Sequence, residues 1–240
     1  MINPPILSFA LWFPIIGGLL VLLCGSLFEK IQSNTLKVVA LAISFVSLIL
    51  SLIPLIFFEP AYSKMQFTEK AVWIKDFGIH YSLGVDGISI FFLPLTSLIT
   101  FIVIISAWDV IKENVPLYLG NFLIMSGLLI GVFCALDGVL FYVFFEATLI
   151  PMYFIIGIWG GENRIYAAVK FFLYTLLGSL LALVALIYLY ITTNSFSILD
   201  WHKFVLDLPV QLYLFAALFL AFAVKIPMWP VHTWLPDAHV

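Results

Sequence analysis

Seven stretches of about 20 mostly apolar residues constrain this chain more than any other feature of its sequence. Crossing the hydrocarbon core of a bilayer takes about 20 apolar residues as a helix, whereas the strands of a membrane barrel are shorter and alternate apolar with polar residues. Of the 240 residues, 64% are apolar and 10% are charged, and the mean hydropathy is +1.19. A soluble domain of this length could not bury so much apolar surface, so we predict an all-α, polytopic membrane helix bundle.

Short polar joints separate most of the predicted spans, and one longer polar segment covers residues 59–86. Within it, AVWIKDFGIHYSLGVDG alternates apolar and polar residues between glycines, which indicates a small surface hairpin. Met1–Pro5 is too short and too uncharged to be the basic region of a cleavable signal, so we expect the first span to be retained. The predicted spans are Ile6–Phe28, Leu36–Phe58, Gly87–Trp108, Pro116–Leu136, Gly138–Trp159, Tyr166–Ile191 and a seventh from about Gln211 onward.

Lysine and arginine in the short joints predict how the chain crosses the bilayer. Short loops on the cytoplasmic side are enriched in these residues. The odd-numbered joints hold Lys30, Lys37, Lys112 and Arg164, whereas the short even-numbered joints hold only Lys203. We therefore expect the odd joints on the cytoplasmic or matrix side and the amino terminus outside. Separately, we divide the chain into two parts. Residues 1–115 hold spans one to three with the outer loop at 59–86, and residues 116–240 hold spans four to seven.

Several classes of function have no support in the sequence. A net charge of −3 without a basic cluster argues against nucleic acid as a partner. Cys24 and Cys134 lie far apart inside apolar runs, so we interpret them as small buried side chains and not as a disulfide or a zinc or iron–sulfur site. The run Gly160–Arg164 follows a predicted membrane helix and not a strand, which favours a turn over a phosphate loop. No nicotinamide, flavin or nucleotide motif is present.

Glu146 lies within the fifth predicted span, about 12 Å from its start at 1.5 Å per residue. An acidic side chain near the bilayer centre costs roughly 2.5–3.5 kcal/mol on insertion scales, and such residues commonly handle ions or protons. Tyr142 and Tyr153 share its helical face and could hydrate it, and Pro151, by freeing the carbonyl of Ala147, predicts a kink just past the glutamate. The alternative for Glu146 is a structural role, as a permanently protonated or permanently paired side chain. The alternative for Pro151 is a kink that serves packing alone.

Lys225 is the second ionisable residue inside a predicted span, and Pro227 and Pro230 follow it at once. Prolines cannot donate backbone hydrogen bonds, so we expect the seventh helix to break there and the carbonyls of Ala223 and Ile226 to lose their usual partners. Freed carbonyls and the negative end of the half-helix would stabilise the lysine ammonium. The alternative is a lysine that reaches the surface from an ordinary helix end.

Lys170 and two histidines are further candidates for carrying protons. Lys170 lies about one turn inside the sixth span between Tyr166 and Tyr174, offset from Glu146 by about 12 Å, so we expect a water-linked relay residue or a structural anchor. His232 and His239 lie near the broken helix and are either proton carriers or polar lining. The remaining histidines, at positions 80 and 202, are expected in loops, and haem ligation is not expected from this distribution.

Two stretches together, LDGVLFYVFFEATLIPMYFIIGIWGGENRIYAAVKFFLYTLLGS and AVKIPMWPVHTWLPDAH, closely resemble the subunit M family of bacterial NADH-quinone oxidoreductase, called subunit 4 in mitochondrial respiratory complex I. The likeness covers essentially the whole chain. The forms FFEATLIPM and GGENR favour this family over the sister subunits L and N and over subunits of multisubunit cation/proton antiporters. In the family, the glutamate and lysine that fall on Glu146 and Lys225 form the central pair of a proton half-channel, and a helix 6 lysine falls on Lys170.

The resemblance implies a proton-translocating membrane subunit without redox chemistry of its own. NADH, quinone and the redox cofactors would be handled by other subunits, and the partners would be other membrane-arm subunits and the lipid bilayer. The expected location is the bacterial plasma (inner) membrane or the mitochondrial inner membrane. The family pattern continues beyond residue 240 into helix 8 and an inverted repeat, which implies a fragment or a split gene. A cation/proton antiporter subunit and a non-conducting scaffold remain the alternatives.

Overall fold

The computed structural model describes residues 4–27 and 32–239, without the side chain of His239, and is mostly helical. Within these residues, seven segments of 18 to 30 residues are helical, long and apolar enough to cross a membrane. They are α1 (Ile6–Leu27), α2 (Ser33–Ile56), α3 (Ser89–Val110), α4 (Val115–Cys134), α5 with α6 (Gly138–Ala147 and Leu149–Trp159), α7 (Arg164–Thr193) and α9 (Leu208–Lys225). The prediction of seven helical spans is thus confirmed for the described part of the chain.

The helix ends differ from the predicted ones by up to three residues. The added residues include polar ones at helix starts, for example Ser33 and Asn34 in α2 and Arg164 in α7. A helix can extend past the apolar run because its first turn needs no partner inside the membrane. Phe28 and Lys30, which entered the predictions of the first span and of orientation, lie outside the described residues.

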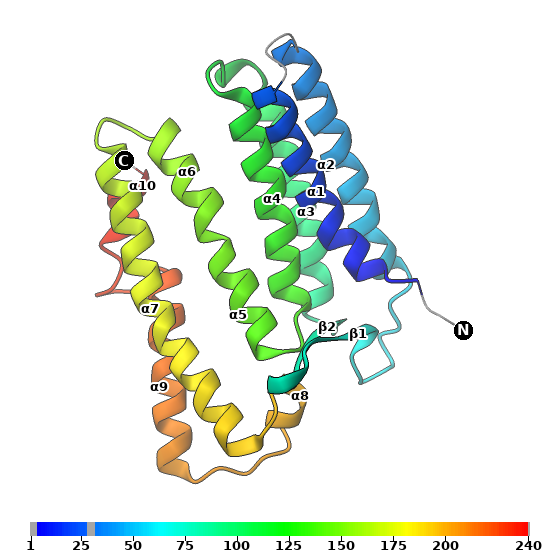
Figure 1. Ribbon diagram of the computed structural model, residues 1–240, viewed down its shortest axis with the longest axis vertical. Helices are drawn as coiled ribbons and strands as arrows, with labels where there is room; N and C mark the ends of the chain where they lie inside the picture. Colours follow the sequence, from blue (N-terminus) through cyan, green and yellow to red (C-terminus); the bar gives the residue numbers. More distant parts are fainter. Residues whose placement is uncertain (1–3, 28–31, 240) are drawn as a thin grey trace. The chain divides into compact units, whose positions relative to one another are not determined.

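Two compact units divide the chain, Met1–Ala71 with Tyr81–Ala135 and Val72–His80 with Leu136–Val240. In the first unit, α1 packs on α4 and α2 packs on α3, and Figure 1 shows these four helices side by side. Helix α4 packs within the first unit. Small residues permit this packing, since a Cβ added to Gly18 would come within 2.7 Å of the Gly120 carbonyl oxygen.

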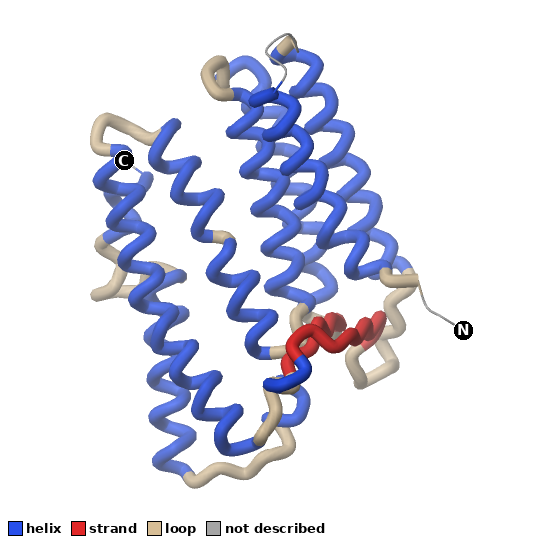
Figure 2. Tube along the Cα trace, in the orientation of Figure 1, coloured by secondary structure: helices blue, strands red, loops and turns tan. Residues whose placement is uncertain are grey.

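A two-stranded hairpin forms where the alternating segment predicted one. Strand β1 (Gln66–Ile74) pairs with β2 (Ile79–Val85) across a single 3-10 turn (Lys75–Phe77), and Figure 2 draws the two strands in red. Gly78 closes the turn with φ of 64°, a left-handed conformation that glycine adopts at little cost. The predicted surface hairpin is therefore confirmed, and His80, expected in a loop, lies in β2.

The hairpin side chain of Glu69 caps the start of α1. Its carboxylate accepts hydrogen bonds from the backbone of Leu7 (2.8 Å) and Ser8 (3.2 Å) and from the Ser8 hydroxyl. The Tyr81 hydroxyl lies 2.8 Å from the Ser8 hydroxyl and accepts from the Trp12 indole at 3.1 Å. Burial raises the pKa of the Tyr81 phenol, and its hydrogen bonds to Ser8 and Trp12 oppose that rise. The first N–H groups of a helix have no partner within it, so this carboxylate supplies what the helix lacks.

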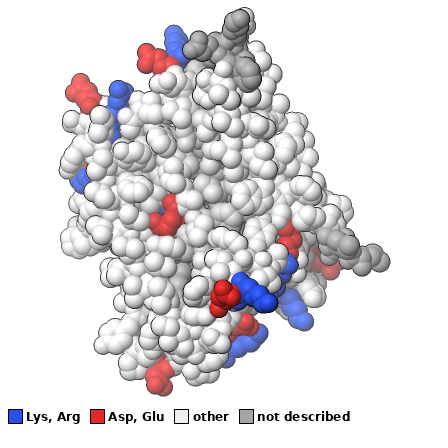
Figure 3. Space-filling model, in the orientation of Figure 1, with Lys and Arg blue, Asp and Glu red and all other residues white. Residues whose placement is uncertain are grey.

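In the second unit, the long helix α7 contacts α5, α6, α8 (Ile198–Trp201), α9 and α10 (Trp234–His239). Buried apolar side chains from α6, α7 and α10 form one core cluster, made of Leu149, Ile156, Ala167, Ala168, Phe171 and Trp234. The face drawn in Figure 3 is uncharged over most of its area, as expected for a surface that contacts lipid. Helix α7 is therefore the element on which the other helices of this unit are assembled.

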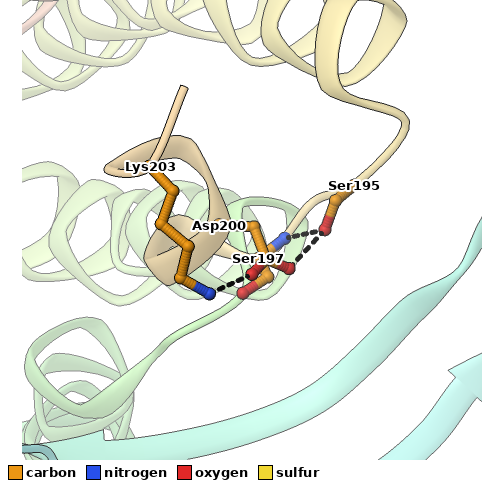
Figure 4. A network of polar contacts seen from close by, with 4 residues as sticks. All are labelled: Ser195, Ser197, Asp200 and Lys203. Carbon is orange, nitrogen blue, oxygen red and sulfur yellow. Dashed lines mark hydrogen bonds and ion pairs between the residues drawn. The ribbon is translucent and has the colours of Figure 1, made fainter. Parts of the chain in front are cut away.

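A polar network outside the spans orders the loop around α8. The Ser195 hydroxyl donates to Asp200 (3.1 Å) and accepts from the Ser197 backbone, while Lys203 donates to Asp200 at 2.9 Å (Figure 4). Lys203 and then Ser195 hold the pKa of the Asp200 carboxyl below its ordinary value. This short helix was not predicted, because four residues carry too little periodicity to be recognised.

We predict that Glu69→Ala destabilises the first unit by about 1–2 kcal/mol, since the substitution leaves the first N–H groups of α1 without an acceptor. Thermal unfolding of the purified protein in detergent would measure the change. Lys70→Ala is the matched control, because the neighbouring Lys70 side chain is exposed. Equal melting temperatures for the two variants would contradict the capping role.

Candidate functional site

The start of α5 is fixed by an almost fully buried aspartate. Asp137 accepts hydrogen bonds from the backbone N–H groups of Val139 (3.0 Å) and Leu140 (3.2 Å), which makes it the N-cap of α5. Its second carboxyl oxygen accepts from the backbone of His80 at 3.0 Å. Sequence reasoning missed this residue, although an aspartate directly before an apolar helix is a known capping signal. Asp137 thereby sets the register of the helix that carries Glu146.

The predicted kink past Glu146 is present as a break at Thr148. Helix α5 ends at Ala147 and α6 begins at Leu149. Pro151 lies three residues into α6 and has no N–H group to donate to the Ala147 carbonyl. The Thr148 hydroxyl turns back and donates to the Phe145 carbonyl at 2.7 Å. The break therefore exposes a carbonyl and a hydroxyl in the middle of a membrane span.

Lys225 reaches this break from α9. Its Nζ lies 3.3 Å from the Phe145 carbonyl oxygen and 3.3 Å from the Thr148 hydroxyl oxygen. The same Nζ lies 4.1 Å from the centroid of the Phe145 ring, a cation–π distance. An ammonium buried among apolar groups must be partnered, and here the partners flank Glu146 on its own helix. The structure thus places Lys225 beside the segment that carries Glu146.

Glu146 presents its carboxyl group to the interior without a hydrogen-bond donor. Among the described residues, neither carboxyl oxygen has a partner, and both oxygens are buried. Its electrostatic neighbours are Ser179, whose hydroxyl donates to the Leu176 carbonyl at 2.8 Å, and Lys225. In the described part of the chain, ion pairs join Lys170 with Asp237 and Lys203 with Asp200, but none joins Glu146 and Lys225 directly. The acid and the base are near one another and unpaired.

The two tyrosines expected beside Glu146 have different surroundings. Tyr142 is an electrostatic neighbour of Glu146 and Ser179. Tyr153 follows the break at Thr148, and its ring packs edge to face against Phe172 at 5.8 Å between centroids. Tyr142 is thus a polar neighbour of the carboxyl group, and the ring of Tyr153 packs on α7.

The end of α9 confirms the predicted break. Helix α9 ends at Lys225, and the chain continues through turns to α10. The Ala223 carbonyl loses its usual partner, as predicted, because residue 227 is a proline, and it accepts instead from the Met228 backbone at 2.8 Å. The Val224 carbonyl accepts from the Trp234 indole, also at 2.8 Å. A looser turn and a side chain replace the hydrogen bonds that Pro227 and Pro230 cannot donate.

The hydrogen-bond partners of the Lys225 ammonium come from outside its own helix. The carbonyl that it contacts belongs to Phe145 on α5. Sequence reasoning considered each broken helix separately, whereas the structure brings the break of one helix to the lysine at the end of another. No pattern along the chain encodes that pairing.

Lys170 and Asp237 form an ion pair at 2.5 Å between α7 and α10. Lys170 also lies 5.6 Å from the centroid of the Tyr166 ring. The sequence analysis did not single out Asp237, because an acid seven residues beyond Pro230 resembles an ordinary helix-end residue. The Nδ1 of His232 is buried without a hydrogen-bond partner among the described residues, and the side chain of His239 lies outside them. Within the described residues, no three His, Cys, Asp or Glu side chains come together to hold a metal ion.

Known proteins resemble this chain in sequence. Residues 135–240 match the family described as NADH:quinone oxidoreductase/Mrp antiporter, TM. NADH-quinone oxidoreductase subunit M of Rhodobacter capsulatus is 53% identical over 217 residues, which cover 85% of this chain and 42% of the relative. Subunit M of Rickettsia prowazekii is 45% identical over 242 residues, covering 100% of this chain and 49% of the relative. This chain is a homologue of subunit M.

Solved structures show the same fold. A chain of respiratory complex I from Thermus thermophilus matches with a TM-score of 0.83 and 30% identity, over 97% of this chain and 46% of that one. A chain of an archaeal membrane-bound sulfane sulfur reductase matches with a TM-score of 0.82 at 17% identity, which supports the fold alone. The chain spans less than half the length of the subunit M relatives named here. The fold class, a polytopic helical membrane bundle of the antiporter-like type, is thereby confirmed.

We predict that Gly178→Ala, but not Gly157→Ala, disturbs the packing beneath Lys225. A Cβ at Gly178 would come within 2.8 Å of the Val224 Cβ, next to Lys225, whereas a Cβ at Gly157 would lie 3.5 Å from its nearest neighbour, the Ala168 Cβ. Overpacking typically costs about 1–3 kcal/mol. Thermal unfolding in detergent should therefore show a lower melting temperature for Gly178→Ala only, and matching values for the two variants would contradict the close approach of α7 and α9.

Proposed function

We propose that this chain is a proton-translocating membrane subunit of NADH:quinone oxidoreductase, in which Glu146 and Lys225 form the central pair of a half-channel. The subunit M relatives support this proposal by their names and by identities of 45–53%. The single observation that carries it is the placement of Lys225 against the break of α5, beside a buried carboxyl group that has no partner in the described residues. Such a pair is the arrangement in which ionisation can change with small movements.

The contacts of Lys225 suggest how the pair works. Its ammonium rests on neutral partners, a carbonyl and a hydroxyl, about 3.3 Å away. In this arrangement the unpaired Glu146 is favoured as the neutral acid, because an isolated buried carboxylate is costly. A swing of the lysine toward Glu146 would stabilise the carboxylate, so the proton would leave; the return swing would favour its uptake. We propose that quinone reduction elsewhere in the complex drives this change through hydration of the interior.

The remaining predicted residues enter the proposal as relay groups. Lys170, His232 and His239 would pass protons between the central pair and the aqueous surfaces. Redox cofactors, NADH and quinone would be bound by other subunits, and the chain alone would catalyse no redox reaction. The membrane would be the bacterial plasma membrane or the mitochondrial inner membrane, with the odd-numbered joints on the cytoplasmic or matrix side.

We predict that Glu146→Gln and Lys225→Ala each reduce proton pumping by about tenfold or more, equivalent to about 1.4 kcal/mol or more in the barrier. Glutamine keeps the shape of the acid but cannot exchange a proton, and alanine removes the mobile charge. Proton uptake by membrane vesicles, driven by NADH and followed with a pH-sensitive dye, measures the effect in the assembled complex. Lys203→Gln is the control, since Lys203 forms an exposed ion pair outside the spans. Full pumping by both site variants would refute the assigned roles.

A second candidate, a subunit of a cation/proton antiporter without a redox partner, is favoured by the family match, whose description covers Mrp antiporters as well. Purification of the native assembly separates the two. Quinone-reductase activity in the purified assembly supports the first proposal, and cation exchange without such activity supports the second. Assembly of the 240-residue chain without a further partner, and without proton movement, would favour a non-conducting scaffold.

A further inference from the structure

A polar cavity of about 470 Å³ lies where α10 meets the beginning of α7. It is lined by the loop residues 161–164, by Tyr166 at the start of α7, and by Pro236 and Asp237 of α10. The lining carries two acids, Glu162 and Asp237, and one arginine, Arg164, whose guanidinium donates to the Ile158 carbonyl at 2.7 Å. The volume is large enough for several water molecules, at about 30 Å³ each.

Asp237 belongs both to this cavity and to an ion pair that leads away from it. Its carboxylate lines the cavity and accepts from Lys170 of α7 at 2.5 Å. The side chains of Asp237 and Lys170 are 38% and 25% exposed, respectively, so the acid is the more accessible member and the lysine the more enclosed one. Figure 1 shows α10 beside the first part of α7, the two helices that the pair joins. The pair thus lies at the edge of the cavity, with Lys170 as its less exposed member.

The segment that leads from the end of α9 into α10 carries ionisable groups along its length. It begins with Lys225 at the α5 break, continues with His232, whose buried Nδ1 has no partner among the described residues, and reaches Asp237 at the cavity. The unpartnered Nδ1 is a group that could accept or donate a proton. Among the described residues, the segment from Lys225 to Asp237 therefore has an ionisable group at each end, Lys225 near Glu146 and Asp237 at the cavity.

We propose that Asp237, paired with Lys170, is a further protonatable residue of the conducting path and exchanges protons with water in this cavity. In each cycle the Lys170 ammonium releases one proton to water on its inner side, the Asp237 carboxylate takes one proton from cavity water and passes it to the neutral Lys170 amine, and both groups return to their starting charges. No other reactant is consumed. The inference rests on the proposed function, and it adds the group that connects the central pair to the aqueous side.

A purely structural role for the pair, fastening α10 to α7, is the alternative that a test must separate. Asp237→Asn removes the titratable group but leaves Lys170 without a counter-charge. The double variant Lys170→Gln with Asp237→Asn removes both charges and permits an amide–amide hydrogen bond at the same place. Asp237→Glu keeps a titratable carboxyl group. These three variants separate proton exchange from fastening.

The measurement is NADH-driven proton uptake by membrane vesicles, corrected for the amount of assembled complex. We expect Asp237→Asn and the double variant to lose about tenfold or more in pumping rate, which corresponds to about 1.4 kcal/mol or more in the barrier. Asp237→Glu should retain most of the pumping rate. Asp200→Asn, in the exposed ion pair with Lys203, is the matched control and should pump normally.

Three outcomes would overturn the inference. They are normal pumping by Asp237→Asn, recovery of pumping in the double variant, which would show that charge balance alone matters, and loss of pumping in Asp237→Glu. If Asp237→Asn does not assemble, the double variant and Asp237→Glu decide between the same two roles. Normal pumping by Glu146→Gln and Lys225→Ala would instead refute the proposed function, whereas defects in those variants with normal pumping by Asp237→Asn would refute this inference alone.

Discussion

The second unit depends on one requirement, that the ammonium of Lys225 must find partners inside an apolar bundle. A bilayer offers none, so the protein supplies them from interrupted backbone. The break between α5 and α6 presents the Phe145 carbonyl and the Thr148 hydroxyl to the lysine. Two helices with proline-linked interruptions are thereby brought together at the same place, and Glu146 lies within the contact. The irregularities that would weaken either helix alone become the polar centre of the unit.

Much of this architecture could be predicted because lipid constrains sequence strongly. Apolar runs of about 20 residues located all seven spans, and Pro151 and Pro227 located the two breaks, since a missing N–H group has the same consequence in any surroundings. The hairpin followed from alternation and from Gly78. These features depend on neighbours along the chain, and neighbours along the chain are what a sequence displays.

The partners of the functional side chains could not be predicted in the same way. The separation between Phe145 and Lys225 is 80 residues, and nothing in either segment specifies the other. Asp237 was overlooked for the same reason, because its importance appears only when α10 lies against α7 and brings it to Lys170. Asp137 differs, since its capping role is local and a search for helix starts would have found it.

The hydrogen bond from the Trp234 indole to the Val224 carbonyl links α10 to the backbone beside Lys225. Val224 directly precedes Lys225, and Trp234 lies three residues before Asp237 on a helix that packs on α7. The Trp234 ring is buried against Phe171. Because such interiors are closely packed, a tilt of α10 would move the Trp234 side chain and the carbonyl that it contacts. A displacement of α10 would therefore also displace the backbone next to Lys225, so the position of the lysine depends on how α10 packs on α7.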